Sequence, residues 1–370
     1  MMTTIEVPED LSGLDEAIAQ VPNQPAVFLL WPREGDPYLA KTALLRRRLL
    51  RMLGAREKPS RLFNLRHTVR RIEYRLTGSA FESGIVMYEL ARRLFPKTYL
   101  EQVKLRMPTY VKLVLTNEFP RSQLTTHIGR APALYFGPFC SRASAERFES
   151  QFLDLFQMRR CQEDLQPSPE HPGCIYGEMS MCLRPCQQVV GRDEYLHEVG
   201  RVAEFLKSGG HSLLETIGHA RDRYSEEMMF EEAARQHKRY EKVQEVLKLR
   251  DDLARDIDRL HGVAITPSAA PNAVELWFVR EGHWQAPQRL SFEVQEGKPV
   301  SLDGKLRDVF GALEMRQLTM RERQEYLALL ARWYYSSWRD GEWLPIETFE
   351  SPPYRKLVHA ISRAARRDLP

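Results

Sequence analysis

The sequence predicts a multi-domain α+β protein, and three observations lead to this expectation. The chain has 370 residues, enough for two or three domains. Strand-like and helix-like segments alternate in the N-terminal part, and apolar residues recur at helical spacing further on. Four of the five cysteines lie in one loop between these regions. We therefore expect a short helix over residues 1–20, a small αβ domain over 21–105, a cysteine-rich domain over 106–210, an antiparallel helical hairpin over 211–260 and an α+β domain over 261–370.

The composition is that of a globular protein without a membrane anchor. Hydrophobic residues make up 43% of the chain and charged residues 28%, as in ordinary globular domains. No apolar run reaches the length that spans a bilayer, and the N-terminus is acidic where a leader peptide would be basic. We therefore expect neither a signal peptide nor an anchor, and a reducing, cytoplasmic location.

The N-terminal domain is expected to be a small αβ unit. Residues 26–32 and 37–40 predict two strands of a hairpin. A helix follows from Thr42, with apolar residues on one side and basic residues on the other. Residues 70–77 predict a further strand, and Ser79 has the character of an N-cap that opens a second helix.

Positive charge is concentrated in this domain. The net charge of the chain is +4, but residues 41–75 carry twelve Lys or Arg against two acids, which makes this segment +10 and the remainder −6. Such a dense positive field is typical of a polyanion site, although a solvated helical face is the simpler interpretation of a charge run. The candidate phosphate contacts on the first basic helix are Arg46, Arg47, Arg48 and Arg51.

Four clustered cysteines predict a metal site. They are separated by twelve, seven and three residues in a loop rich in proline and glycine, which can turn several thiols toward one point. A reducing location favours metal ligation over disulfides, and the residues alone leave zinc and iron equally open. Ordinary buried cysteines are the remaining alternative. The expected ligands are Cys161, Cys174, Cys182 and Cys186, with Cys140 outside the set.

The segment after residue 211 predicts a helical hairpin. Apolar residues at spacings of three and four run from about Ser212 to Tyr224 and from Met229 to Leu260. The pattern fits either a coiled-coil spacer or an element that docks a partner, and the small core of a short hairpin favours docking. The candidate partner contacts are Phe230, Glu231, Ala233 and Ala234.

An aromatic cluster lies near the end of the C-terminal helical region. Its members are Trp333, Tyr334, Tyr335 and Trp338. These rings could stack on bases, but their helical spacing favours a packed core face.

Five phrases give the chain a specific resemblance over residues 20–250. They are TYVKLVLTNEFPR (109–121), YFGPFCSR (135–142), the cysteine loop ending in CLRPC, DEYLHEVGRVAEFLKSG (193–209) and FEEAARQHKRYEKV (230–243). In this order they resemble the UvrC excinuclease family of nucleotide excision repair. The resemblance implies a GIY-YIG nuclease domain at the N-terminus, an iron–sulfur (4Fe–4S) cluster on the four cysteines, and a UVR motif in the hairpin that meets UvrB.

The resemblance is incomplete at the nuclease residues. Tyr38, Lys41 and Arg48 stand where the family has a tyrosine, a lysine and an arginine. Phe28 replaces the other tyrosine, Ala40 replaces a glycine, and Met87 aligns with the glutamate that holds the divalent metal. A thioether is a poor ligand for hard Mg²⁺. We therefore expect a DNA-binding protein whose first nuclease centre does not cut.

Two alternatives remain open at this level. The first is a divergent metal-dependent GIY-YIG endonuclease that uses Glu82 or Glu89, although both are turned well away from position 87 on a helix. The second is an iron–sulfur redox-sensing module that binds DNA. Residues 261–370 resemble the family's segment after the UVR motif, and we expect them to lack the complete second nuclease.

Overall fold

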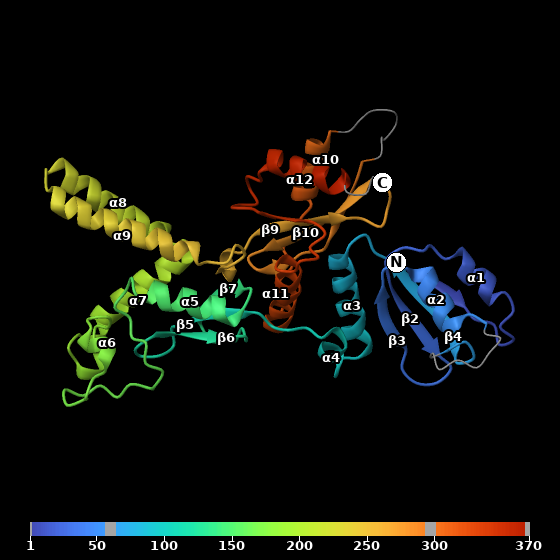
Figure 1. The fold of residues 1–370 in the computed structure, drawn as a ribbon, viewed down its shortest axis with the longest axis horizontal. Coiled ribbons are helices and arrows are strands. Elements are labelled where there is room, and N and C mark those ends of the chain that lie inside the picture. The colour runs from blue at the N-terminus through green and yellow to red at the C-terminus, as the bar shows by residue number, and fades with distance from the viewer. Residues whose placement is uncertain (1, 56–63, 293–300, 367–370) are drawn as a thin grey trace.

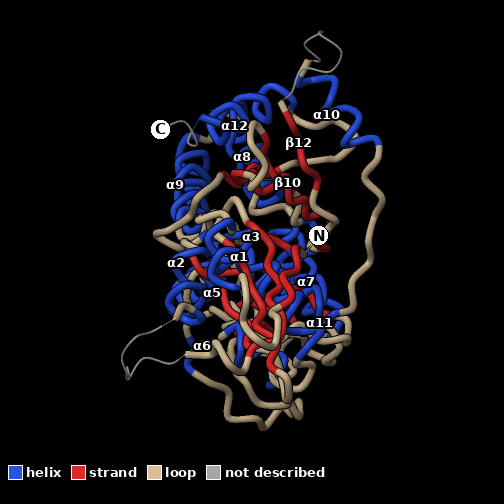
Figure 2. Tube along the Cα trace, turned by 90° about the vertical axis from the view of Figure 1, so that its right-hand side faces the viewer, coloured by secondary structure: helices blue, strands red, loops and turns tan. Residues whose placement is uncertain are grey.

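The computed structural model describes residues 2–55, 64–292 and 301–366, and three sheets lie along the molecule (Figure 1). The N-terminal sheet is at one end, and the middle sheet with the helical hairpin is at the other. The C-terminal sheet lies between them, although it comes last in the chain. Helices α10 and α12 are at the top of the molecule both in this view and after a turn of 90° (Figure 2). None of the helices within these three ranges is long and apolar enough to cross a membrane.

The N-terminal domain is an antiparallel sheet with helices on both faces. Its strands, in spatial order, are β1 (Thr3–Glu6), β4 (Val69–Leu76), β2 (Ala26–Pro32) and β3 (Tyr38–Thr42). One face packs on α1 (Leu14–Gln20) and α2 (Leu45–Leu53), and the other on α3 (Ala80–Leu94), which is followed by α4 (Tyr99–Val103). The side chain of Ser79 accepts a hydrogen bond from the Glu82 amide, so the predicted N-cap is confirmed.

The predicted helix over residues 1–20 is wrong in its first part. Residues 3–6 form β1, which pairs with β4, and the helix begins only at Leu14. Two β-branched threonines and Ile5 favour a strand here. Gly13 adopts a left-handed conformation (φ 68°) directly before the helix and separates the two elements.

The middle domain is a second antiparallel sheet covered by helices. Its strands are β6 (Arg121–Thr125), β5 (Thr109–Val114), β7 (Ala133–Phe139) and β8 (Arg255–Asp256), in spatial order. Helices α5 (Arg142–Leu153) and α7 (Arg192–Lys207) pack on this sheet and supply many of the aromatic and aliphatic residues of the core. The cysteine loop between them holds only the short helices α6 (Ile175–Glu178) and η1 (Pro185–Gln187). Because β8 follows the hairpin in sequence, the hairpin is an insertion into this domain.

The hairpin consists of α8 (His211–Glu226) and α9 (Phe230–Lys248), and it projects from the molecule (Figure 1). The prediction that the second helix continues to Leu260 is wrong. Leu253, Ile257 and Leu260 are fully buried in the central core shared with α3 and the C-terminal sheet. Their helical spacing is coincidental, because tertiary packing decides the conformation of this segment: residues 257–259 form the 3₁₀ helix η2.

The C-terminal domain has helices on both faces of a five-stranded sheet. Strand β10 (Ala273–Arg280) pairs with β9 (Gly262–Pro267) on one side and with β11 (His283–Trp284) and β12 (Gln288–Ser291) on the other, and β13 (Glu342–Pro345) extends the sheet beyond β9. Helices α10 (Leu302–Gly311) and α12 (Tyr354–Arg366) cover one face, and α11 (Met320–Tyr334) covers the other. An α+β fold with several sheets agrees with the predicted class.

Helix α11 connects the three domains. The carboxyl group of Glu325 accepts hydrogen bonds from Tyr88 and Tyr99 of the N-terminal domain, each 2.6 Å long. The side chain of Gln324 accepts a 2.8 Å hydrogen bond from the Ile128 amide of the middle domain. Trp333, in the last turn, is buried and stacks on Phe81 with ring centroids 4.6 Å apart. The expectation of a core face is therefore confirmed for Trp333, whereas Trp338 beyond the helix is 46% exposed.

Candidate functional site

Tyr38 and Arg48, two of the nuclease-like positions, lie in contact. Arg48 extends from α2 and donates a 3.4 Å hydrogen bond to the Tyr38 hydroxyl oxygen. Phe28 lies beside Tyr38, with ring centroids 6.2 Å apart, and is fully buried in the core under α1 and α2. A phenyl ring at position 28 packs well but offers no hydroxyl group to a phosphate or a water molecule.

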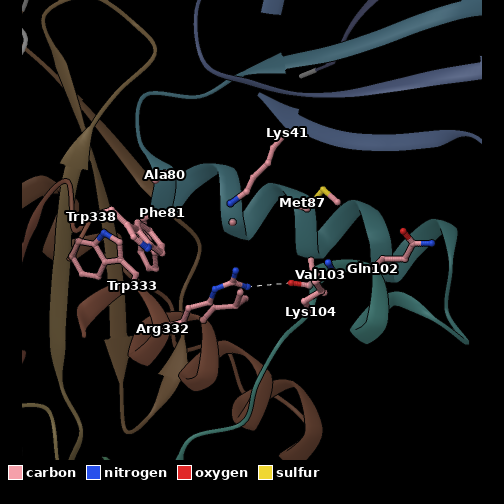
Figure 3. Close-up of a pocket in the computed structure, with 12 residues that line it drawn as sticks. Lys41, Ala80, Phe81, Met87, Gln102, Val103, Lys104, Arg332, Trp333 and Trp338 are labelled. Carbon is pink, nitrogen blue, oxygen red and sulfur yellow. Dashed lines mark hydrogen bonds between the residues drawn. The ribbon is translucent and has the colours of Figure 1, made fainter. Parts of the chain in front are cut away.

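Lys41 is directed to the opposite face of the sheet. It pairs with Val27, and side chains alternate along a strand, so Lys41 extends toward α3 (Figure 3). Tyr38 and Ala40 lie on the other face of the strand, toward α2. It lines a cavity of 210 Å³ together with Met87 of α3 and Arg332 of α11. Partial burial, and then the charge of Arg332, lower the pKa of Lys41. The aligned metal position is thus a thioether beside two cations, which does not suit Mg²⁺.

The two glutamates that could replace a metal ligand do not line this cavity. Glu82 is buried at the start of α3, where it accepts a 2.8 Å hydrogen bond from the Gly78 amide and forms a 3.3 Å ion pair with Arg75. Burial raises the pKa of the Glu82 carboxyl group. Glu89 accepts a 3.2 Å hydrogen bond from the Tyr326 hydroxyl group. Both carboxyl groups therefore have structural partners in the described parts of the chain.

The arginines of α2 separate into two groups. Arg47, Arg48 and Arg51 line an open hollow with Lys41. Arg46 instead donates a 2.7 Å hydrogen bond from Nε to the Val21 carbonyl, just beyond the end of α1. A third hollow is lined by basic residues that the sequence did not single out, because they come from three separate parts of the chain. They are Lys104 and Arg106 of the segment between α4 and β5, Arg142 of α5 and Arg332 of α11.

The cysteine loop brings its four thiols into one region. Burial is the main cause that raises the pKa of Cys182, to about 11, and repulsion from the other three cysteines of the loop adds to it. Burial and the charges of Cys161 and Cys174 likewise raise the pKa of Cys186. The four thiols of the loop are therefore close enough for their charges to interact. Cys140 lies apart from them, just before α5, where its amide donates a hydrogen bond to Asp251.

The loop around these thiols is shaped by two glycines. Gly173 adopts a left-handed conformation (φ 75°) directly before Cys174. A Cβ atom on Gly177 would lie 2.7 Å from Cγ of Arg184, whose amide donates a 3.4 Å hydrogen bond to the Cys182 sulfur. The loop thus approaches itself closely between Gly177 and Arg184, beside Cys182.

The chemistry of these donors fits a soft metal centre. Thiolates that repel one another are stabilised by a metal, which also displaces their protons. Arg159 adds one cation by donating a 3.3 Å hydrogen bond to the Cys161 sulfur. Within residues 2–55, 64–292 and 301–366, no group of three or more Cys, His, Asp or Glu side chains is arranged closely enough to ligate a single metal ion.

The free end of the hairpin exposes an apolar surface, which we call the hairpin tip and define as Met228, Met229 and Phe230. Met228 is 77% and Phe230 is 67% exposed. Nearby on α9, Ala233 is half-buried, and Glu231 and Ala234 are exposed. The buried residues of the hairpin pack into the middle-domain core; they are Leu213, Ile217, Val243 and Val246. The tip therefore has no part in the core of the described chain.

Comparison with known proteins gives matches over most of the chain. Residues 110–205 match the family described as "UvrC/Cho excinuclease, middle domain". UvrABC system protein C of Moorella thermoacetica is 27% identical over 324 residues, which cover 87% of this chain and 49% of that protein. The protein of the same name from Lachnospira eligens is 24% identical over 78% of this chain and 48% of its own length. That of Ruminiclostridium cellulolyticum is 21% identical over 95% of this chain and 58% of its own length.

These matches cover most of this chain but only part of each relative. The chain spans about half the length of the first two relatives. No solved structure matches it significantly. The family match covers β5 to α7, the part that contains the cysteine loop. Together with the relatives, it shows that the chain is similar to proteins of the UvrC family over most of its length.

Proposed function

We propose that this chain is a UvrC-like protein of nucleotide excision repair that binds DNA and does not cut it with its N-terminal domain. The relatives are named UvrABC system protein C, which supports the repair process. The observation that carries the non-cleaving part is Met87. It lines a cavity with Lys41 and Arg332, at the position where the resemblance to UvrC implies a metal-binding carboxylate.

The chemistry of DNA cleavage explains why this position matters. A GIY-YIG centre needs an oxygen ligand for its metal and a polar group near the attacked phosphate. Here Met87 and Phe28 supply a thioether and a buried phenyl ring. The retained Tyr38, Lys41 and Arg48 supply charge and hydrogen bonds, which are sufficient for holding a phosphate without cleaving it.

The hairpin tip supports the proposal that UvrB is a partner. Exposed apolar residues at the end of a projecting hairpin are typical of a docking surface. Phe230 opens the FEEAAR phrase of the UVR-like motif, and Glu231, Ala233 and Ala234 lie in the same turns of α9. The small alanines allow close approach of another helix.

The four clustered thiols support a 4Fe–4S cluster, with zinc as the alternative. A single zinc ion needs its four sulfurs at about 2.3 Å from one point. A cluster places iron and sulfide between its ligands, so their thiolates lie further apart. Cys161, Cys174, Cys182 and Cys186 would hold the group, and it would brace the loop between the DNA-facing part of the chain and the hairpin.

A cleavage assay tests the central proposal. The purified chain is incubated with labelled damaged and undamaged duplexes in Mg²⁺ or Mn²⁺, and binding is measured on the same duplexes by anisotropy. The expected result is binding without cleavage. Cleavage that disappears in Arg48→Ala but persists in Arg235→Ala, an exposed arginine of α9, would establish the alternative of a divergent endonuclease that uses another carboxylate.

A further inference from the structure

The three hollows that hold the basic residues are adjacent and share lining residues, and we call them together the basic band. Lys41 lines both the α2 hollow and the 210 Å³ cavity between α3 and α11. Lys104 and Arg332 line both this cavity and the third hollow, beside α5. Among the described residues that line the three, eight are Lys or Arg and none is Asp or Glu. The band therefore crosses all three domains and suits a polyanionic strand.

The cavity between α3 and α11 differs from the two neighbouring hollows because apolar side chains form part of its lining. Phe81, Met87 and Trp338 contribute to its walls, and the cations Lys41 and Arg332 enter from opposite sides (Figure 3). Its volume of 210 Å³ is below the range of about 300–1,000 Å³ that is usual for drug-sized ligands. A space of this size suits a single planar ring with a neighbouring anion, which is the chemistry of one nucleotide.

One carboxylate, that of Asp340, acts on Lys41 electrostatically, but its hydrogen bonds are made with other groups. Its two oxygens accept hydrogen bonds from the Ala80 amide and from Nε1 of Trp333. Arg332 donates a 3.1 Å hydrogen bond to the Val103 carbonyl, which holds its guanidinium group beside the cavity. Arginine has further donors that remain available to a phosphate in this geometry.

We propose that this cavity receives one unstacked base of a bound DNA strand, while Lys41, Lys104 and Arg332 hold the adjoining phosphates. This proposal rests on the proposed function, DNA binding, and specifies how a DNA strand is held beside the nuclease-like position Lys41. A base within a strand is favoured over a free nucleotide because the cavity shares its walls with a basic hollow on each side. Trp338, which is 46% exposed, provides an aromatic surface for stacking.

Gly84 offers a way to close the cavity without disturbing the fold. It lies within α3 and lines the cavity, and a Cβ atom there would meet no atom within 4 Å apart from its chain neighbours and its own helix backbone. A leucine at this position would extend into the open space. Gly200 of α7 is a matched control, since its Cβ would also be free and it lines a separate hollow that contains Glu204.

The test compares two labelled duplexes by fluorescence anisotropy, one fully paired and one with a single unpaired thymine. The wild-type chain is expected to bind the second duplex about tenfold more tightly. No base pair has to be opened before the unpaired thymine enters the cavity, and the thymine gains stacking on Trp338. Gly84→Leu is expected to bind both equally, and Gly200→Leu to keep the preference. Trp338→Ala provides a second variant at an exposed position and is expected to lose most of the preference. Thermal unfolding verifies that each variant is folded.

The possible outcomes separate this inference from the proposed function. Equal binding of the two duplexes by the wild type, or a preference that survives in folded Gly84→Leu or Trp338→Ala, would overturn the inference while leaving DNA binding intact. Competition by free thymidine monophosphate as effective as that by the unlabelled duplex would also overturn it and assign the cavity to a free nucleotide. Failure to bind either duplex would overturn the proposed function together with this inference.

Discussion

Tyr88 donates a 2.6 Å hydrogen bond from its hydroxyl group to Glu325, which lies 237 residues further along the chain. Glu325 is only 2% exposed, and its other carboxyl oxygen accepts an equally short hydrogen bond from Tyr99. Burial, and then the hydrogen bond to Glu325, raise the pKa of Tyr88 above its usual range. One carboxyl group of α11 thus joins the C-terminal domain to α3 and α4 of the N-terminal domain.

Removing this carboxyl group is expected to destabilise the whole molecule. Glu325→Ala leaves two tyrosine hydroxyl groups buried without their acceptor and is expected to lower the free energy of unfolding by about 3 kcal/mol. Tyr88→Phe removes one donor only and is expected to cost about 1 kcal/mol. Urea denaturation measures both. Glu314→Ala, at an exposed position, should change the midpoint little, and equal midpoints for Glu314→Ala and Glu325→Ala would contradict the prediction.

A second contact between α11 and α3 is expected to make stability depend on acid pH. Glu322 is partly buried, but a 2.8 Å hydrogen bond from Arg92 and two from Thr319 outweigh that effect and lower the pKa of Glu322 to about 2. The stabilisation that the ionised Glu322 gives the folded state is therefore complete above pH 4.5, the ordinary pKa of a glutamate. It is lost as the pH falls from 4.5 to about 2. We expect a loss of about 2 kcal/mol over this window.

The variant Glu322→Gln isolates this contribution. Its urea midpoint should fall less than that of the wild type between pH 5 and pH 2 because glutamine does not titrate. Glu226→Gln, an exposed position at the end of α8, should keep the wild-type slope. A Glu322→Gln protein with the full acid-dependent loss would show that other carboxyl groups cause it.

Three of the four strands of the N-terminal sheet, and the helices α2 and α3, could be predicted because their signals are local. The strands near 26–32, 38–42 and 69–76 follow β-rich runs, and Ser79 caps α3 through its own side chain. The resemblance to UvrC likewise rested on short phrases, and the match over residues 110–205 covers the central ones. Local sequence was therefore sufficient for these elements and for the resemblance to UvrC.

The cavity between α3 and α11 could not be predicted in this way. Lys41 and Arg332 come from opposite ends of the chain, and neither has a sequence neighbourhood that indicates the other. The same holds for β8, a strand of two residues whose partner β7 precedes the hairpin. The helical spacing of Leu253 and Ile257 led to the wrong prediction that α9 continues to Leu260. These residues are apolar because they pack in the central core. Long-range packing decided each of these features.

Iron loading is expected to depend on the cysteines of the loop. A chain purified without air should contain about four irons and absorb broadly in the visible range. Cys182→Ser should lose both properties, whereas Cys140→Ser should retain them because Cys140 lies apart from the cluster. Since the pKa of the free Cys182 thiol is about 11, its proton must be displaced on binding, and loading should improve as the pH rises from 6 toward 9. One zinc per colourless wild-type chain would contradict the cluster.

The hairpin tip is expected to carry much of the affinity for UvrB. Phe230→Ala removes an exposed ring and should weaken binding about tenfold or more, with the thermal midpoint unchanged, because the side chain is not part of the core. Calorimetry with purified UvrB measures the affinity. Leu115→Ala removes an exposed apolar side chain after β5 and serves as the control. Equal affinities of the two variants would exclude the tip as the main contact.

The salt dependence of DNA binding should distinguish the arginines that the sequence presents as equivalent. A residue that contacts one phosphate contributes about 0.9 to the slope of log affinity against log salt concentration. Lys41→Gln and Arg47→Gln should therefore each lower the slope by about 1. Arg46→Gln should lower it less, because Nε of Arg46 is bound to the Val21 carbonyl and the side chain lies outside the basic hollow. Lys238→Gln, exposed on α9 and remote from the band, should leave it unchanged. The slope counts the phosphates that the cations of the protein neutralise, because each neutralised phosphate releases counterions. If Lys238→Gln reduced the slope as much as Lys41→Gln, the DNA would therefore contact the hairpin, which would contradict binding along the basic band.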